Sequence, residues 1–230
     1  RHAAAMLPLV HSLDPSRMVM LNSGRWDLGT DYGMSKVQGV RVWPKDRPTE
    51  PWVGINVTRE TVRALGITWP AGHLALHPGP ANEQSVVRWT APEAGPLEVS
   101  GAFIGLAGRA TTDVHVLQQG RALFDGLVNL GGQGSDCSWE GSVKVEAGQA
   151  IDFAIGYGNG NYGGDTTAVS ASLRKKGTSA EKAEFDSGRD GSLKKNPHGP
   201  WTYGAYAGGK TPDAATFQAF PCDPPPPYGA

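Results

Sequence analysis

Apolar and polar side chains alternate along most of residues 85–173. A period of two places every second side chain on the same face of a strand, so one face of each strand can enter a core. Turn-forming residues rich in Gly, Pro and Asn separate the alternating runs. Short strands at this spacing predict a mainly β fold, an antiparallel β-sandwich or jelly roll. The clearest alternating sets are Val114 and Val116, Val143 and Val145, and Ile151, Phe153 and Ile155.

The sequence on either side of this region has other patterns. Residues 1–13 have apolar positions at helical spacing, and residues 18–24 form a nearly continuous apolar run, which predicts a helix followed by a buried strand. Because the chain begins inside this helix, we expect it to be a fragment of a longer protein. We expect a helix–strand fragment (1–26), a linker (27–50), the sandwich (51–174), a second linker (175–184), and residues 185–230 as either the start of a second β unit or the final strands of the first.

Composition narrows the classes of partner. The chain has 32 Gly, 18 Pro and only 19% charged residues, which fits a loop-rich β protein with a packed core. A formal net charge of −1 offers no basic surface for nucleic acid, so we expect no nucleic-acid partner. No apolar run is long enough for a transmembrane helix, so we expect no membrane insertion. Two cysteines are present, and whether Cys137 pairs with Cys222 stays open.

The predicted sandwich contains no sequence motif of a known catalytic site. There is no G-x-S-x-G, no H-E-x-x-H and no phosphate-binding loop in residues 51–174. The carboxylates of this region are expected to lie on solvated faces or to cap turns, so we expect no catalytic site within this fragment. They are Asp113, Asp125, Asp136, Glu140, Asp152 and Asp165.

One loop of the sandwich has the residue types that bind sugars. Sugar recognition combines aromatic faces with amides and carboxylates that bond to hydroxyls, and glycine allows close approach of the backbone. The loop at 156–167 has this composition, although Gly/Asn loops are also ordinary hairpin turns and a Trp in a sandwich is often part of the core. The glycan-binding candidates are Tyr157, Asn159, Asn161 and Tyr162, with Trp139, Trp69 and Trp26 as further aromatic residues.

The same loop is a candidate calcium site. Calcium takes carboxylate, amide and backbone oxygens in flexible geometry, and Asn159, Asn161 and Asp165 could supply them. The spacing does not match an EF-hand loop. We therefore expect at most a structural calcium ion, and no other cofactor is required.

Two stretches resemble known families. The segment LDPSRMVMLNSGRWD, residues 13–27, is similar to a segment of glycoside hydrolase family 2-like (β/α)8 enzymes, where it follows the helix after the strand that bears the acid/base glutamate. The resemblance implies that residues 1–26 belong to such a barrel and that its catalytic residues lie outside this chain. The alternative is a helix–strand pair of another α/β domain.

The second resemblance covers about a hundred residues. The pieces HPG, VVRWTAP, TTDVHVL and IDFAIGYGNGNYGGDTT occur in the order found in a bacterial β-sandwich module of secreted and cell-surface proteins, many of which act on polysaccharide. Residues 196–204, NPHGPWTYG, resemble the opening of a second unit of this kind. The resemblance implies a carbohydrate-binding-like module located outside the cell or on its surface.

Together these features predict a non-catalytic carbohydrate-binding accessory module of a larger extracellular glycoside hydrolase-like protein. Its partners would be a polysaccharide or glycan and other domains of the same chain. Three alternatives remain: a structural spacer, a protein-interaction sandwich without glycan binding, and an insertion that shapes the active site of the parent hydrolase.

Overall fold

The computed structural model describes residues 50–129, 136–177, 185–191, 195–209 and 211–221, and the backbone of residues 40–43. The helix and strand predicted at 1–13 and 18–24, together with Trp26 and Cys222, lie outside the described residues.

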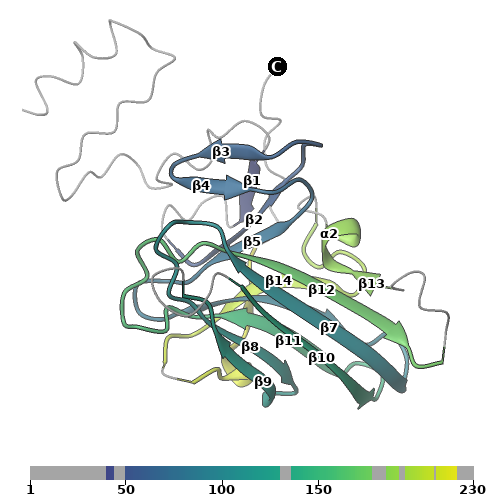
Figure 1. Cartoon of the computed structure of the whole chain (residues 1–230). Coiled ribbons are helices and arrows are strands. Elements are labelled where there is room, and N and C mark those ends of the chain that lie inside the picture. Colours follow the sequence, from purple (N-terminus) through teal and green to yellow (C-terminus); the bar gives the residue numbers. More distant parts are fainter. Residues whose placement is uncertain are drawn as a thin grey trace, which may run out of the picture.

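The structure consists of antiparallel sheets, and the predicted β-sandwich is confirmed (Figure 1). One sheet has seven strands, of which β13 (Phe185–Asp186) pairs with part of β12. The other six follow in the order β1 (Val40–Trp43), β2 (Trp52–Asn56), β5 (Leu74–His77), β12 (Thr167–Lys175), β7 (Gly95–Gly105) and β10 (Asp136–Val145).

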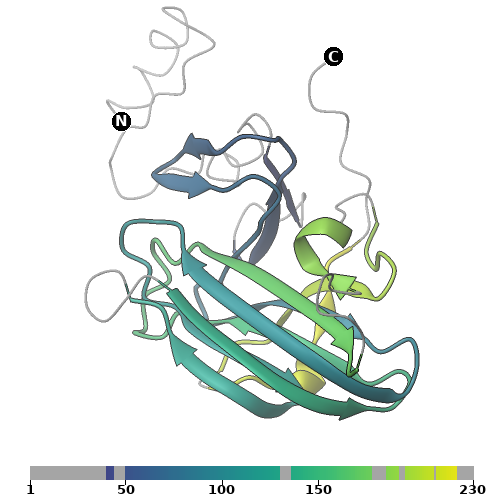
Figure 2. The ribbon, with the colours of Figure 1, turned by 45° about the vertical axis from the view of Figure 1, so that its right-hand side comes forward.

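The second sheet has six strands and faces the first (Figure 2). Its order is β15 (Gln218–Ala219), β14 (Trp201–Tyr206), β6 (Gln84–Thr90), β11 (Ala150–Ile155), β8 (Asp113–Gln118) and β9 (Arg121–Leu127). The remaining elements are the hairpin β3 (Val62–Ala64) and β4 (Ile67–Trp69), the short helix α2 (Ser187–Asp190) and the 3-10 turn η2 (Ala214–Thr216).

The core lies between the two sheets and is filled by the alternate apolar positions of their strands. Gly101 of β7 shows how closely the sheets approach, because a Cβ atom there would come within 3.0 Å of the Phe153 ring on β11. Among the buried core residues, β7 and β12 supply Val99, Phe103, Val169 and Leu173, and the facing sheet supplies Val87, Trp89, Val116, Phe153, Trp201 and Tyr203.

Four strands, β1, β13, β14 and β15, come from outside the 51–174 segment. β14 pairs with β6 over six positions, and its residues Trp201 and Tyr203 are fully buried in the core. β1 lies within the stretch 27–50, where a linker was expected, and pairs with β2. The alternating sequence Val-Arg-Val-Trp at 40–43 is a short strand signal that the surrounding Gly, Asp and Lys residues obscure. Residues 185–221 therefore add strands to the same sandwich.

Candidate functional site

The outer face of the six-stranded sheet is covered by the C-terminal part of the chain. Phe217 and Ala214 pack on buried Val86, Leu117 and Tyr206 of that face. Beneath them Asp152, fully buried, accepts hydrogen bonds from Arg88 Nε at 2.7 Å and Nη2 at 2.8 Å.

The Tyr206 hydroxyl also donates to Asp152, and the Arg88 guanidinium lies 3.7 Å from the centre of the Phe217 ring. The expectation of a solvated carboxylate was therefore wrong for Asp152. Alternation correctly placed it on the outer face, but the segment that covers that face is distant in sequence.

Part of the outer face of the seven-stranded sheet is covered by the β3–β4 hairpin. The Trp52 and Trp69 rings stack with centroids 5.6 Å apart. Buried Asn56 ties the hairpin down, because its Nδ2 donates to Trp69 O at 2.9 Å and its Oδ1 accepts from Thr58 N at 2.9 Å. Trp69, another aromatic residue, is 1% exposed and has no face available to a ligand.

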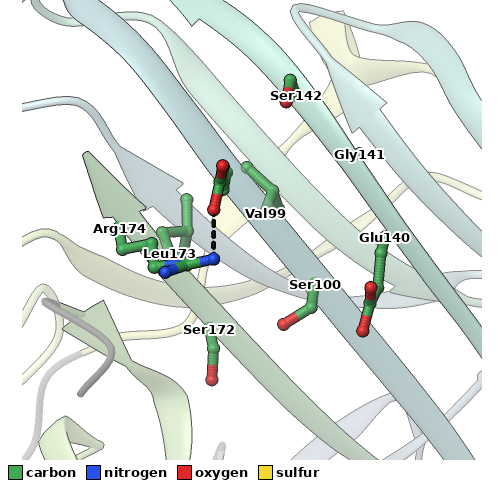
Figure 3. Close-up of a pocket in the computed structure, with 9 residues that line it drawn as sticks. Val99, Ser100, Glu140, Gly141, Ser142, Ser172, Leu173 and Arg174 are labelled. Carbon is green, nitrogen blue, oxygen red and sulfur yellow. Dashed lines mark ion pairs between the residues drawn. The ribbon is translucent and has the colours of Figure 1, made fainter. Parts of the chain in front are cut away.

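The rest of that outer face, over β12, β7 and β10, forms an open groove of about 540 Å³ (Figure 3). Its polar groups are hydroxyls, carboxylates and one guanidinium, held on three adjacent strands of one sheet. The groove is lined by Glu98, Val99, Ser100, Glu140, Gly141, Ser142, Ser172, Leu173 and Arg174.

Strand register arranges these polar side chains in two rows that cross the strands. Ser100 of β7 is paired with Glu140 of β10 on one side and with Ser172 of β12 on the other. We call this the serine row. The serine row continues toward β13, because Ser172 Oγ donates to Asp186 Oδ2 at 3.1 Å. The Glu140 side chain is exposed and has no hydrogen-bond or ion-pair partner among the described residues.

A second row lies two residues away from the serine row on each strand and consists of Ser142, Glu98 and Arg174. We call it the ion-pair row, because Arg174 Nη2 and Glu98 Oε2 form an ion pair across it (Figure 3). Both side chains are about one third exposed, so this pair is a surface interaction that contributes little to stability. It nevertheless holds two charged groups at defined positions in the groove.

The predicted glycan-binding loop connects β11 and β12 at one end of the sandwich. The side chains of Asn159 and Asn161 are exposed, but each Oδ1 accepts a hydrogen bond from the loop backbone, from Asn161 N and Gly163 N respectively, both at 2.9 Å. Tyr162 is half-buried and forms a T-shaped contact with the His77 ring, and Tyr157 is half-buried as well. These four residues therefore lie together on a loop whose backbone is held by the two asparagine side chains.

Trp139 lies away from this loop. It occupies the inner side of β10 and packs partly against the core. Trp139 on β10 pairs with Gly101 on β7. Gly105, four positions further along β7, pairs with Thr167, the first residue of β12 after the loop. This corresponds to about 13 Å along the strand. The structure thus brings Tyr157, Asn159, Asn161 and Tyr162 together but not Trp139.

A cluster of titratable groups anchors the base of the loop. Asp113 Oδ1 accepts from Gly158 N at 2.8 Å, and Asp113 Oδ2 lies 3.0 Å from His115 Nε2. Asp125 Oδ1 lies 2.6 Å from His115 Nδ1. Burial alone would lower the pKa of His115, but the bonds and charges of Asp113 and Asp125 outweigh it and raise the pKa. The cluster thus connects β8, β9 and the loop.

Asp165 closes the other end of the loop. Its Oδ1 accepts from Thr111 N at 2.7 Å, while its Oδ2 is buried and has no hydrogen-bond partner. Burial raises the pKa of Asp165 to about 6, with a further contribution from the charge of Asp113. Asn159, Asn161 and Asp165 belong to one loop, but an oxygen of each of the three predicted calcium ligands already accepts a backbone hydrogen bond. The described residues contain no cluster of three or more His, Cys, Asp and Glu suited to a metal ion.

The sequence prediction missed the groove. Alternating Ser, Glu and Arg positions are visible on each of the three strands, but nothing in the sequence says that β10, β7 and β12 are neighbours. Within the part of the chain that the structure describes, no helix is long and apolar enough to span a bilayer.

Comparisons with known proteins define no family for the chain. No protein-family model matches it, and no curated protein matches it. A solved structure of a GH26-CBM35 β-(1,4)-mannanase from Podospora anserina aligns with 62% of this chain at 16% identity and a TM-score of 0.31. A β-glucosidase from Kluyveromyces marxianus aligns with 59% at 12% identity and a TM-score of 0.28. The chain covers 29% and 16% of these two proteins.

Proposed function

We propose that this chain is a non-catalytic glycan-binding module, and that its binding site is the open groove over β12, β7 and β10. One observation carries the proposal. A hollow of about 540 Å³ on the outer face of the seven-stranded sheet is lined by hydroxyl, carboxylate and guanidinium groups that are held on strands of that sheet. These groups match the hydrogen-bonding needs of a polyhydroxylated ligand, and strands hold them in fixed relative positions.

The chemistry of the lining supports binding and not turnover. Glycoside hydrolysis uses a pair of carboxyl groups, and the lining holds two, Glu98 and Glu140. Glu98 is engaged by Arg174. A module of this kind acts by holding an attached enzyme near its polymer, which raises the effective concentration of substrate without chemistry of its own.

The proposal extends to the context of the chain. We place the module in a larger extracellular or cell-surface glycoside hydrolase-like protein of bacterial type, as the sequence resemblances at 13–27 and across the sandwich imply. The structural-spacer and protein-interaction alternatives predict no retention on any glycan, and an insertion that shapes the parent active site would change turnover on small soluble substrates.

The loop at 156–165 is the rival location for the site. Tyr157, Asn159, Asn161 and Tyr162 offer two half-buried rings and two exposed amides on one turn. The structure gives a simple way to separate the two locations, because the loop and the groove share no residue.

The test is a binding screen with the whole 230-residue chain, which is needed because β14 is an interior strand of the six-stranded sheet. Pull-down on insoluble glycans and affinity electrophoresis on soluble ones would be run with and without a calcium chelator. We expect retention on at least one glycan, lost in a Ser100→Val/Glu140→Ala variant and kept in Tyr162→Ala. Circular dichroism and the urea midpoint check that each variant is folded.

Loss in Tyr162→Ala alone would move the site to the loop. Loss on chelation in every variant would support the predicted calcium ion. Absence of retention on plant, algal and microbial glycans would contradict the proposed function and favour a structural spacer.

A further inference from the structure

We infer that the groove takes a neutral glycan whose chain crosses strands β10, β7 and β12 instead of running along them. The inference rests on the proposed function and adds the chemical class and the orientation of the ligand. It follows from the charges that face the groove and from the positions of its two polar rows.

The charges around the groove disfavour an acidic ligand. Arg174 is the only cation among the nine lining residues, and its guanidinium is paired with Glu98. The remaining charged lining residue is Glu140, an exposed carboxylate. At the β13 end of the serine row, Asp186 adds a further carboxylate that accepts from Ser172.

Two lysines at the ends of these strands are themselves close to carboxylates. Lys144 lies 3.9 Å from Glu146, and Lys175 forms an ion pair with Glu93. A uronate or sulfate group in the groove would face the unpaired carboxylate of Glu140, with the hydrogen-bonded carboxylate of Asp186 beyond the end of the serine row, and a like charge without a counter-charge costs affinity. A neutral sugar chain would instead use Glu140 and the serine hydroxyls as hydrogen-bond partners.

The polar rows define the direction in which the glycan would run. Neighbouring strands lie about 4.8 Å apart, so the three strands span about 10 Å across the groove, and the two rows are separated by two residues, about 7 Å, along the strands. A strand spacing of this size is close to the length of one sugar residue in an extended chain. A glycan that crosses the strands would therefore place successive sugars over β10, β7 and β12 and present ring hydroxyls to both rows.

The alternative direction offers fewer partners. Along β7, the next outward positions after Ser100 are Ala102 and Ile104, and Ile104 is 39% exposed. Ser138 and Ser170 flank Ala102 on the neighbouring strands. A glycan centred on β7 and running along it would leave the polar rows after one or two sugars and lie over Ala102 and Ile104, with polar neighbours only at its sides.

The experiment measures affinity of the whole chain by calorimetry for cello- and manno-oligosaccharides of one to six sugars, with oligogalacturonides of matched length as the acidic probe. We expect affinity for a neutral series to rise up to about three sugars and then level, because three strands span about 10 Å. We expect binding of the oligogalacturonides to be weaker by about tenfold or more, as for a charge mismatch of about 1.4 kcal/mol.

Four variants test the direction. Glu140→Gln and Ser172→Ala, at the two ends of the serine row, should each weaken binding of the longest neutral ligand by about fivefold, the effect of one lost hydrogen bond. Ser138→Ala and Ser170→Ala are matched controls on the same strands, one row further along, and should change affinity by less than about twofold.

Several results would overturn the inference and leave the proposed function standing. Equal losses in the control variants would mean that the chain runs along the strands. Tighter binding of oligogalacturonides than of neutral probes would contradict the neutral class. Retention of an acidic polysaccharide in the screen, with no binding of either neutral series, would do the same. Failure of the screen itself would instead contradict the proposed function.

Discussion

The two outer faces of this sandwich differ in how they treat polar groups. On the six-stranded sheet, Asp152 and Arg88 lie beneath the C-terminal segment, and Asp152 accepts hydrogen bonds from Arg88 and Tyr206. On the seven-stranded sheet, Glu140 and its neighbours over β10 stay open to solvent. A charge that is covered must be paired, whereas a charge that stays hydrated can remain free. The covered face therefore contributes to stability, and the open face is available for a ligand.

The largest effect should come from breaking the network on the covered face. Asp152→Ala leaves the largely buried Arg88 without its partner, and we expect the free energy of unfolding to fall by about 3–5 kcal/mol. Urea denaturation monitored by tryptophan fluorescence would measure the change. Glu140→Ala, on the open face, is the matched control and should change stability by less than about 0.5 kcal/mol. Similar effects of the two substitutions would remove the distinction between the faces.

A smaller effect is expected where the seven-stranded sheet is itself covered. Asn56→Ala removes the hydrogen bonds that hold the β3–β4 hairpin on β2 and leaves buried backbone groups unpaired, which should cost about 2 kcal/mol. Limited proteolysis of the hairpin and urea denaturation would measure it. Val57→Ala, at the exposed neighbouring position, should change stability by less than about 0.5 kcal/mol. If the hairpin remained equally protected in Asn56→Ala, Asn56 would not be its anchor.

The smallest effect is the pH dependence of stability that His115 causes at the loop end of the six-stranded sheet. Because Asp113 and Asp125 raise the pKa of His115 in the folded state, protonation of His115 stabilises the fold. This stabilisation is fully present below the unfolded-state pKa of about 6.5 and is lost as pH rises through the higher folded-state pKa. The stability difference between the wild type and His115→Gln should therefore be larger at acidic pH than at alkaline pH.

Thermal denaturation from pH 5.5 to 9 would measure this dependence, with His198→Gln as a control for the loss of an imidazole elsewhere. A difference that did not vary with pH would mean that His115 acts only through packing. His77 is expected to behave in the opposite sense, because burial lowers its pKa to about 4. For His77, stability is lost as pH falls from about 6.5 toward that value.

The sequence by itself determined the class of fold and the inward face of most strands. The period-two pattern at Val114 and Val116, and at Ile151, Phe153 and Ile155, follows directly from strand geometry, and all five residues are buried in the core. The same alternation placed Asp152 outside the core. Local turn chemistry also kept Tyr157, Asn159, Asn161 and Tyr162 on one loop, because they are close in sequence.

Only the tertiary structure decided which outer face was covered and which residues became neighbours across strands. Ser100 is 40 positions from Glu140 and 72 positions from Ser172 in the sequence, and their row exists because β10 and β12 pair with β7 in a particular register. Asp152 became buried because residues near 217 return over its strand. Alternation specifies a face of a single strand, whereas a groove or a cover depends on non-local pairing, for which a single strand carries no signal.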